Sequence, residues 1–235
     1  MQQTYSGGDN DAFVTKLNAP ARVTRYTYDG LLRLIGAVAS PGNSDTYIYD
    51  LAGNRTSVQT NGGTPTTRTY NAADQITNAG YSYDLVGNLL TDGTLTYTYD
   101  ALNRTKTLAG AQSRTYTYNG DGVLVRQVAG ATTTDYTQDL AAPLSQVLQT
   151  KVGATTTSSL YGLERLASRS STPRTWYLDD ALLSVRRTLN DSGVANPPIF
   201  YDPWDTVESG SVPTFGFTRE RYRTTKGAVR GARQA

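Results

Sequence analysis

A four-residue motif, tyrosine–any residue–tyrosine–aspartate, occurs repeatedly along this chain at intervals of about twenty residues. A motif that returns at a nearly regular interval is typical of a stacked repeat fold, in which each unit is one small supersecondary structure. It also favours a structural role, because identical units seldom each carry an active site. The full copies lie at residues 26–29, 47–50, 81–84 and 97–100, with a weaker copy at 116–119 and a decayed one at 70–71.

Each unit has the sequence of a β-hairpin. Tyrosines at positions i and i+2 lie on one face of a strand, and the residue between them lies on the other face. The aspartate can cap the backbone of a type I turn, and Gly or Asn three residues later can take the left-handed conformation of a bulged loop. Turns are therefore predicted at 50–53, 84–87 and 100–103. The residues that define the repeat are Tyr26, Tyr28, Asp29, Tyr47, Tyr49, Asp50, Gly53, Tyr81, Tyr83, Asp84, Gly87, Tyr97, Tyr99, Asp100 and Asn103.

The composition favours an all-β fold of consecutive antiparallel hairpins. Hydrophobic residues make up 37% of the chain, below the roughly 45–50% of ordinary globular domains. The 17 tyrosines supply the apolar surface instead, because a tyrosine ring buries a large area while its hydroxyl finds a partner. No stretch approaches the roughly 18 apolar residues that cross a bilayer, and no signal peptide is visible at the N-terminus. We expect no membrane partner.

Two missing residue types limit the chemistry. The chain has no cysteine and no histidine, which excludes disulfides, thiolate nucleophiles, histidine-dependent catalytic triads and the commonest transition-metal ligands. Carboxylates remain, but the Asp-to-Gly spacing already explains the repeated aspartates as turn caps. We therefore expect no catalytic residue, no cofactor and no metal site. A hydrolase that uses carboxylates is the least favoured alternative.

The repeats resemble the YD repeats of the RHS proteins, a family that includes bacterial Rhs effectors, the C components of insecticidal Tc toxin complexes and teneurin ectodomains. The resemblance is strongest over residues 22–128 and extends to 176–186, 201–204 and 215–218, which are similar to an ordered C-terminal series of the family. It implies a partial spiral β-ribbon, an incomplete form of a hollow β-shell. In toxin members the shell encloses a C-terminal polypeptide, and in other members it is a cell-surface scaffold.

The C-terminal part departs from the family pattern. Leu183 and Asp205 stand where the family has glycine, Ala181 replaces a histidine, and Arg219 replaces another glycine. The block that follows in the family is missing, and the family's self-cleaving aspartate site lies beyond that block. This site cannot be assigned to any residue of this chain, so we expect no self-cleavage.

Changes in the pattern divide the chain into segments. Residues 1–21 form a short N-terminal segment whose residues 4–18 are similar to the closing strand of SBBP-type β-propeller repeats, although a Gly-rich loop with one strand explains them equally well. The other segments are the YD-repeat region 22–128, the diverged repeats 129–175, the segment 176–218 that resembles the C-terminal part of the RHS core, and a basic tail 219–235 that we expect to be disordered. We expect no nucleic-acid partner, because Tyr222 alone is interleaved with the charges of this tail.

Two functions are consistent with these features. The favoured one is a non-catalytic RHS/YD-repeat scaffold, part of a β-shell that encloses or displays another polypeptide, secreted or at the cell surface by family resemblance. The alternative is a carbohydrate-binding module whose exposed rings stack on a cell-surface glycan, with Tyr28, Tyr49, Tyr83 and Tyr99 as candidates. Buried rings would indicate packing, and aligned exposed rings a ligand site. Further YD repeats, in a parent chain or in a partner copy, are the other expected partners.

Overall fold

The computed structural model of the chain describes residues 22–111, 113–141, 145–171, 173–213 and 215–217. The predicted N-terminal segment 1–21 and the basic tail 219–235 lie outside the described residues. The strands are β1 (Val23–Tyr28), β2 (Leu34–Ser40), β3 (Ser44–Tyr49), β4 (Arg55–Thr60), β5 (Thr66–Thr67), β6 (Tyr81–Tyr83), β7 (Leu89–Asp92), β8 (Thr96–Tyr99), β9 (Thr105–Ala109), β10 (Arg114–Tyr118), β11 (Leu124–Ala129), β12 (Thr132–Asp139), β13 (Gln146–Val152), β14 (Thr155–Tyr161), β15 (Arg165–Arg169), β16 (Thr175–Asp179), β17 (Val185–Leu189), β18 (Phe200–Tyr201) and β19 (Val207–Ser209).

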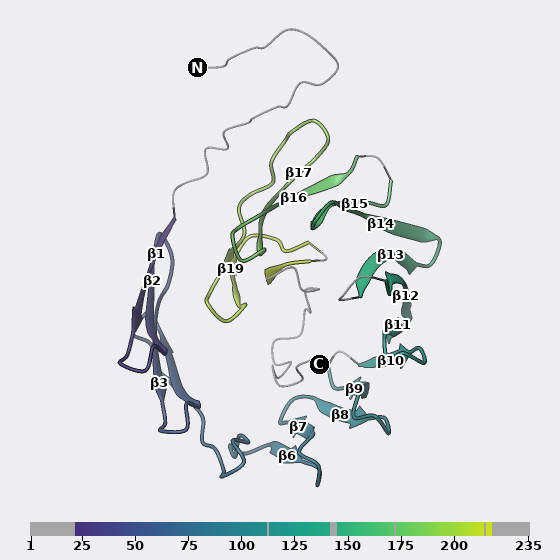
Figure 1. Cartoon of the computed structure of the whole chain (residues 1–235). Coiled ribbons are helices and arrows are strands. Elements are labelled where there is room, and N and C mark those ends of the chain that lie inside the picture. Colours follow the sequence, from purple (N-terminus) through teal and green to yellow (C-terminus); the bar gives the residue numbers. More distant parts are fainter. Residues whose placement is uncertain (1–21, 112, 142–144, 172, 214, 218–235) are drawn as a thin grey trace, which may run out of the picture.

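The strands form two sheets and one short hairpin. β1 to β5 make a five-stranded sheet, β6 to β17 make a twelve-stranded sheet, and β18 pairs with β19. Every strand of the two sheets is antiparallel to its neighbour in the chain, so the sheets are a series of hairpins. Figure 1 shows that the two sheets follow one another along an open curve, with β19 inside it. The fold is the open, all-β ribbon of consecutive hairpins that the sequence predicts.

One turn geometry recurs in the hairpins that follow the tyrosine strands. At Asp84 the carboxylate Oδ1 accepts hydrogen bonds from the backbone N–H groups of Val86 at 3.0 Å and Asn88 at 2.8 Å. The N–H of Gly87 donates to the Asp84 carbonyl at 3.1 Å. Gly87 has a φ of 92°, which glycine adopts without strain because it has no Cβ. The turns at 50–53 and 100–103 have the same closing bond, with φ of 95° at Gly53 and 58° at Asn103.

The turn persists where its sequence has decayed. At 71–74 an asparagine takes the place of the aspartate, and its side-chain oxygen accepts the N–H groups of Ala73 and Gln75 at 2.9 and 3.0 Å. Leu183 and Asp205, which replace glycines of the family pattern, keep positive φ values of 65° and 75°. A residue with a Cβ is strained in this conformation. The surrounding hairpin therefore holds Leu183 and Asp205 in a backbone conformation that is unfavourable for a residue with a Cβ.

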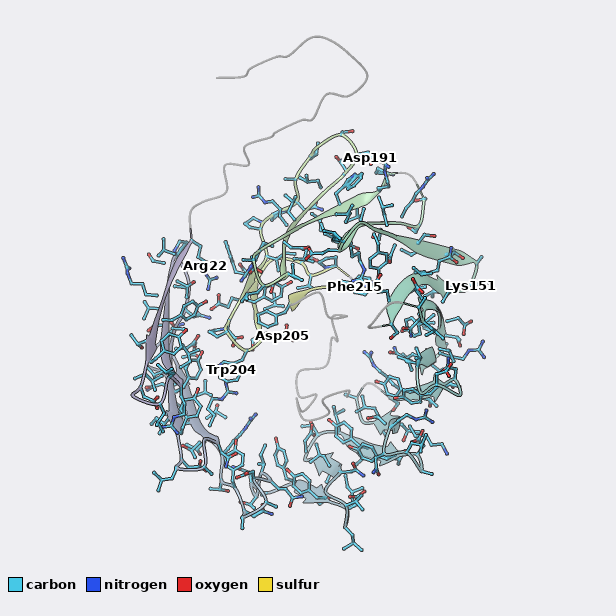
Figure 2. The ribbon with its side chains drawn as sticks, viewed as in Figure 1. Arg22, Lys151, Asp191, Trp204, Asp205 and Phe215 are labelled. Atoms are coloured by element: carbon cyan, nitrogen blue, oxygen red, sulfur yellow. The ribbon has the colours of Figure 1, made fainter. Side chains whose placement is uncertain are left out.

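The tyrosines face the inside of the curve. Tyr47 is 3% exposed, and its ring meets the ring of Trp204 edge-on, with centroids 6.0 Å apart. Trp204 lies inside the curve (Figure 2). Farther along the ribbon, Asp135 pairs across strands with Lys151, which points outward in Figure 2. Because side chains alternate along a strand, the adjacent Tyr136, 7% exposed, faces inward. The concave face is therefore aromatic.

The main hydrophobic cluster lies where the C-terminal segment (residues 196–213 and 215–217, the closing segment) meets the ribbon. Val185, Ile199 and Tyr201 are 1%, 2% and 5% exposed and pack together. The C-terminal segment also covers the outer edge of β17: Ile199 N–H donates to the Arg186 carbonyl at 2.8 Å, and Val185 N–H donates to the Gly216 carbonyl at 3.0 Å. The sequence did not predict this covering. It protects a strand edge that would otherwise present unpaired backbone groups.

Candidate functional site: the concave face and its closing segment

The second tyrosine of a repeat ties its hairpin to the hairpin before it. The hydroxyl of Tyr49 donates to the carbonyl of Leu34 at 2.8 Å, and the hydroxyl of Tyr99 donates to the carbonyl of Leu89 at 2.9 Å. Burial raises the pKa of both hydroxyls, so they remain donors. We call this series of bonds the tyrosine ladder. Its other members are Tyr70 to Arg55, Tyr118 to Thr105, Tyr161 to Val147 and Tyr201 to Val185.

Two positions of the ladder carry a different residue. Gln138 follows the bulge of β12, where other strands have the second tyrosine, and its amide donates to the carbonyl of Leu124. The bulge of β16 places Asp179 at the equivalent position, directly before the turn aspartate Asp180. Glutamine keeps the donor that the ladder needs, whereas an ionised aspartate has none. At β16, therefore, the tyrosine ladder has neither a tyrosine nor a glutamine donor.

Arginines strengthen the link between repeats. Arg33 donates from Nε to Asp29 Oδ2 at 2.7 Å and from Nη1 to the carbonyl of Asp50 at 2.8 Å. Its guanidinium lies 5.0 Å from the ring centre of Tyr49. This contact is a cation–π interaction, and it joins the turn of one hairpin to the ladder tyrosine of the next. Arg104 makes the equivalent contacts with Asp100 and with Tyr118.

The C-terminal hairpin closes the curve by reaching back to the first sheet. The guanidinium of Arg55 on β4 lies 4.0 Å from the ring centre of Trp204. Arg22 forms an ion pair with Glu208, and its guanidinium lies 4.7 Å from the ring centre of Phe200. Residues from the two ends of the described chain therefore meet at this contact. Figure 1 shows β19 inside the curve, on the side that faces β1 and β2.

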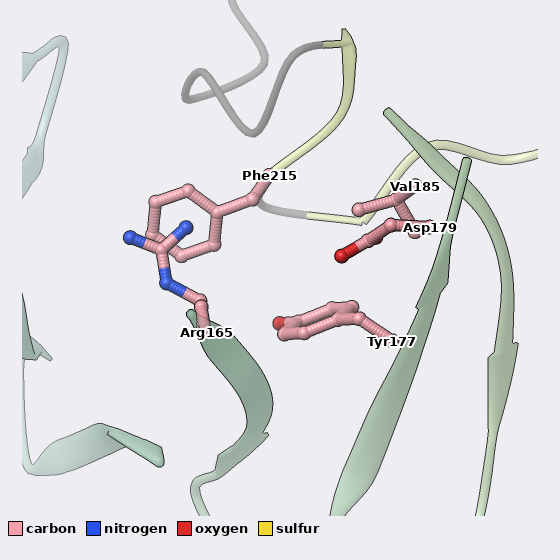
Figure 3. A pocket seen from close by; sticks show the side chains of 5 residues that line it. All are labelled: Arg165, Tyr177, Asp179, Val185 and Phe215. Atoms are coloured by element: carbon pink, nitrogen blue, oxygen red, sulfur yellow. The ribbon is translucent and has the colours of Figure 1, made fainter. Parts of the chain in front are cut away.

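A second cluster joins the end of the described chain to the large sheet (Figure 3). The guanidinium of Arg165 lies 3.3 Å from the ring centre of Phe215. Tyr177 donates to Ser168 Oγ at 2.7 Å, and burial raises its pKa. Asp179 and Val185 complete the cluster, and the space between the side chains is too tight for a water molecule. The cluster is a packing contact, with no room for a ligand.

The aspartates of the four full repeats, Asp29, Asp50, Asp84 and Asp100, have lowered pKa values and are held in the ionised form. A hydrogen bond from the side chain of Asn88 is the main cause of the lowered pKa of Asp84, and a hydrogen bond from the backbone N–H of Arg33 is the main cause at Asp29. A general acid needs a raised pKa, so these carboxylates suit turn capping and not proton donation. Within the described residues, no group of three acidic residues is arranged to hold a metal ion.

The four tyrosines proposed for glycan stacking do not share one environment. Tyr28 is 55% exposed. Tyr49 and Tyr99 are half-buried and belong to the tyrosine ladder. Tyr83 is also half-buried, and its hydroxyl accepts a hydrogen bond from Ile76 N–H at 3.0 Å. The exposure and bonding of the last three rings favour packing over ligand stacking.

Sequence reasoning missed the residues of the closing segment. Trp204 and Phe215 lie inside the motifs that resemble the family's C-terminal series, but no repeat pattern says which strands they contact. Arg55 and Arg165 follow ordinary turns and give no signal of their own. The one available signal was the pair Asp179–Asp180, because an aspartate there breaks the tyrosine–aspartate rule.

Three comparisons relate the chain to known proteins. The sequence model of the teneurin YD-shell matches residues 11–219. No curated protein sequence matches significantly. Among solved structures, the crystal structure of TcdB2-TccC3-Cdc42 is 13% identical with a TM-score of 0.34, over 80% of this chain and 15% of that chain. The Photorhabdus luminescens Tc holotoxin pore is 14% identical with a TM-score of 0.30, over 80% of this chain and 14% of that chain. The chain thus spans about 15% of the length of the structures it matches.

Proposed function

The chain belongs to the teneurin YD-shell family, and from this premise we propose that it is a non-catalytic scaffold, part of a β-shell whose concave face encloses or displays another polypeptide. The observation that supports the proposal is the direction of the tyrosine face. It lines the inside of the curve, where half-buried rings offer apolar surface to an enclosed chain. The ladder bonds already occupy the hydroxyls of Tyr49 and Tyr99, so what these residues offer is shape and apolar area.

The chemistry of the concave face supports the non-catalytic part of the proposal. The sequence contains neither histidine nor cysteine, and the carboxylates of the four full repeats are engaged as turn caps with lowered pKa values. Self-cleavage is not expected either. We further propose that the protein acts outside the cytosol, secreted or at the cell surface, and that other YD repeats are its structural neighbours.

A glycan-binding role is the second candidate, and a specific feature of β1 favours it. Tyr26 and Tyr28 are 49% and 55% exposed on the same face of the strand. An exposed pair of tyrosines at alternate positions is a surface on which a sugar ring can stack. The candidate is therefore confined to β1 and does not extend to the half-buried rings of Tyr49, Tyr83 and Tyr99.

Binding of a model cargo tests the proposal. We would titrate the protein into a fluorescent, permanently unfolded polypeptide and measure anisotropy. Tyr81→Ser with Tyr116→Ser changes two half-buried inward-facing rings for which no hydroxyl bond is observed, and Ile48→Thr is the outward-facing control, 62% exposed. We expect binding by the wild type and the control and loss of binding by the inner-face variant. Equal binding by all three proteins would mean that the concave face does not bind the polypeptide.

Two further measurements address the alternatives. Intact-mass spectrometry of the purified protein during prolonged incubation should show no time-dependent fragments, and a specific cleavage would contradict the non-catalytic assignment. A glycan array probed with the wild type and with Tyr28→Ala distinguishes the glycan-binding role from the scaffold role. Binding that depends on Tyr28 would indicate a sugar site on β1.

A further inference from the structure

The closing segment is attached to the two sheets in different ways. Backbone hydrogen bonds join it to β17 of the large sheet. The N–H of Ile199 donates to the carbonyl of Arg186 at 2.8 Å, and the N–H of Asn196 donates to the carbonyl of Thr188 at 2.9 Å. Among the described residues, no backbone hydrogen bond joins the closing segment to the first sheet, β1 to β5. The closing segment is therefore part of the large sheet in its backbone and only a neighbour of the first sheet.

Side chains make the contact between the closing segment and the first sheet. The ring of Trp204 meets the ring of Tyr47 edge-on and lies 4.0 Å from the guanidinium of Arg55. Glu208 forms an ion pair with Arg22. Contacts between side chains can separate without any loss of strand pairing, so both sheets would stay intact if this contact opened.

One polar group in this contact lacks a partner. Arg55 Nη1 is buried and has no hydrogen bond to another described residue, and burial lowers the pKa of Arg55. An unpaired buried donor destabilises the state in which it is buried. Separation of the contact would return this group to water, which offsets part of the cost of losing the ring contacts.

The pairing of strands is interrupted between the two sheets. β5 ends the first sheet and β6 begins the large one, so no ladder of backbone bonds spans the link at residues 79–80. Two hydrogen bonds between described residues cross this link: Tyr81 N–H donates to the Asn78 carbonyl at 3.2 Å, and Ile76 N–H donates to the Tyr83 hydroxyl at 3.0 Å. Figure 1 shows the strand-free passage that leads to β6. Hinges are typically a few such loop residues, at places with few bonds to break.

We propose that the closing segment is a clasp, and that the first sheet swings away from it about residues 79–80 to open the curve. The movement uncovers the inner face of β3, where Tyr47 is 3% exposed while the clasp is closed. The clasp therefore controls how much of the aromatic concave face a polypeptide can reach. The identity of the entering polypeptide rests on the proposed function, whereas the movement itself does not.

Distances within single molecules test the movement, because labelling sites can be introduced into a chain that has no cysteine of its own. Fluorophores on Ile48→Cys and Ser211→Cys report the distance across the clasp by energy transfer. Fluorophores on Lys151→Cys and Ser211→Cys report a distance between the large sheet and the closing segment. All three positions are exposed. Opening should lower energy transfer for the first pair and leave the second pair unchanged.

A variant of the clasp should shift the molecules toward the open form. Trp204→Leu with Glu208→Gln removes the cation–π contact and the ion pair. We expect the ratio of open to closed molecules to rise at least about tenfold. Asp135→Asn is the matched control, because it breaks an ion pair with Arg126 within the large sheet, and it should leave the ratio as in the wild type. A clasp variant with the wild-type ratio would overturn the proposal.

Hydrogen exchange locates the hinge. In the clasp variant the amides of Ile76 and Tyr81 should exchange faster, and the amide of Asn88, which donates within an intact turn, should not. Faster exchange along the whole chain would mean that the variant unfolds, and this would also overturn the proposal. Neither measurement needs a polypeptide. A clasp that opens in a protein that binds no unfolded polypeptide would reject the proposed function and confirm the movement.

Discussion

From β6 to β11 each hairpin is held by the hairpin next to it, whereas the C-terminal segment is held by residues from the other end of the described chain. Tyr99 reaches the carbonyl of Leu89 in the adjacent strand. Trp204, in contrast, lies against Arg55 and Tyr47 of the first sheet. The first region uses one contact many times, and the second uses contacts that occur once.

The difference indicates how each region is stabilised. In a repeat array each unit contacts only its neighbours, so its stability is approximately a sum of local terms. The closing segment adds contacts of long sequence separation, and the entropy cost of such a contact grows only slowly with the length of the closed loop. A substitution in the ladder should therefore weaken one junction, and a substitution in the closing segment should weaken the link between both ends.

The largest effect is expected from Ile199→Ala. Ile199 is 2% exposed in the cluster with Val185 and Tyr201, and truncation of a buried isoleucine costs about 2–5 kcal/mol of unfolding free energy. Ile48→Ala on the outer face of β3, where the side chain is 62% exposed, should change it by no more than about 0.5 kcal/mol. Urea denaturation of both variants measures the difference. Equal values would mean that the closing segment contributes no more than the ribbon surface.

A smaller loss is expected from Gly87→Val in the regular region. Gly87 has a φ of 92°, and the nearest atom to a new Cβ would be Gln75 Nε2 at an ordinary 3.7 Å. The cost is therefore conformational, about 1–2 kcal/mol. Gly120 is the matched control, since it lies in a turn without positive φ and has open space around it. Thermal melts should rank Gly87→Val below Gly120→Val, and the reverse order would contradict the turn assignment.

Tyr99→Phe tests the ladder directly. It removes the hydroxyl that donates to Leu89, and we expect a loss of about 1 kcal/mol because a half-buried carbonyl loses its partner. Tyr28→Phe is the control within the same motif, because Tyr28 is 55% exposed and should change the unfolding free energy by less than about 0.5 kcal/mol. If both variants match the wild type in denaturant melts, ring packing alone joins the hairpins.

Leu183→Gly should stabilise the protein slightly. Leu183 has a φ of 65° in the turn after β16, and relief of this strain outweighs the added freedom of glycine in the unfolded chain by about 0.5 kcal/mol. Leu102→Gly, in the equivalent turn but without positive φ, gains nothing and should destabilise. Opposite shifts in melting temperature are the expected result. A fall for both variants would mean that Leu183 makes contacts that outweigh its backbone strain.

The smallest effect concerns Asp191, next to the closing segment. The backbone N–H of Arg174 and the indole of Trp176 lower its pKa from 3.8 to about 2. A carboxyl with a lowered pKa stabilises the folded state above its ordinary pKa, and the contribution is lost as the pH falls from about 3.8 through about 2. The difference in melting temperature between the wild type and Asp191→Asn should therefore shrink over this range. A difference that stays constant with pH would exclude this linkage.

Most of the local structure could be predicted from the sequence because its causes are local. The period of two places the tyrosines on one face, and the spacing from Asp84 to Gly87 specifies the turn. The same reasoning holds for the turns at 50–53 and 100–103. The exposure of the rings could not be predicted in the same way. The sequence did not reveal that Tyr28 is exposed while Tyr99 is half-buried, because exposure depends on which strand lies beside each ring.

The contacts that build the candidate functional surfaces join residues that are far apart in the sequence. The sequence predicted the repeat and its resemblance to the RHS proteins, but the ladder bonds, such as that from Tyr49 to Leu34, join residues whose proximity follows only from the pairing of adjacent hairpins. Gln138 illustrates the limit, because its role as a donor is visible only once the bulge of β12 places it at the tyrosine position.

By itself, then, the sequence determined the strands, the turns and the face on which the tyrosines lie, because these follow from the stereochemistry of a few consecutive residues. The tertiary structure alone decided that the curve closes through Trp204 on Arg55 and Arg22 on Glu208. These features depend on the twist and curvature accumulated over many strands, and no local pattern encodes where the ends of such a ribbon meet.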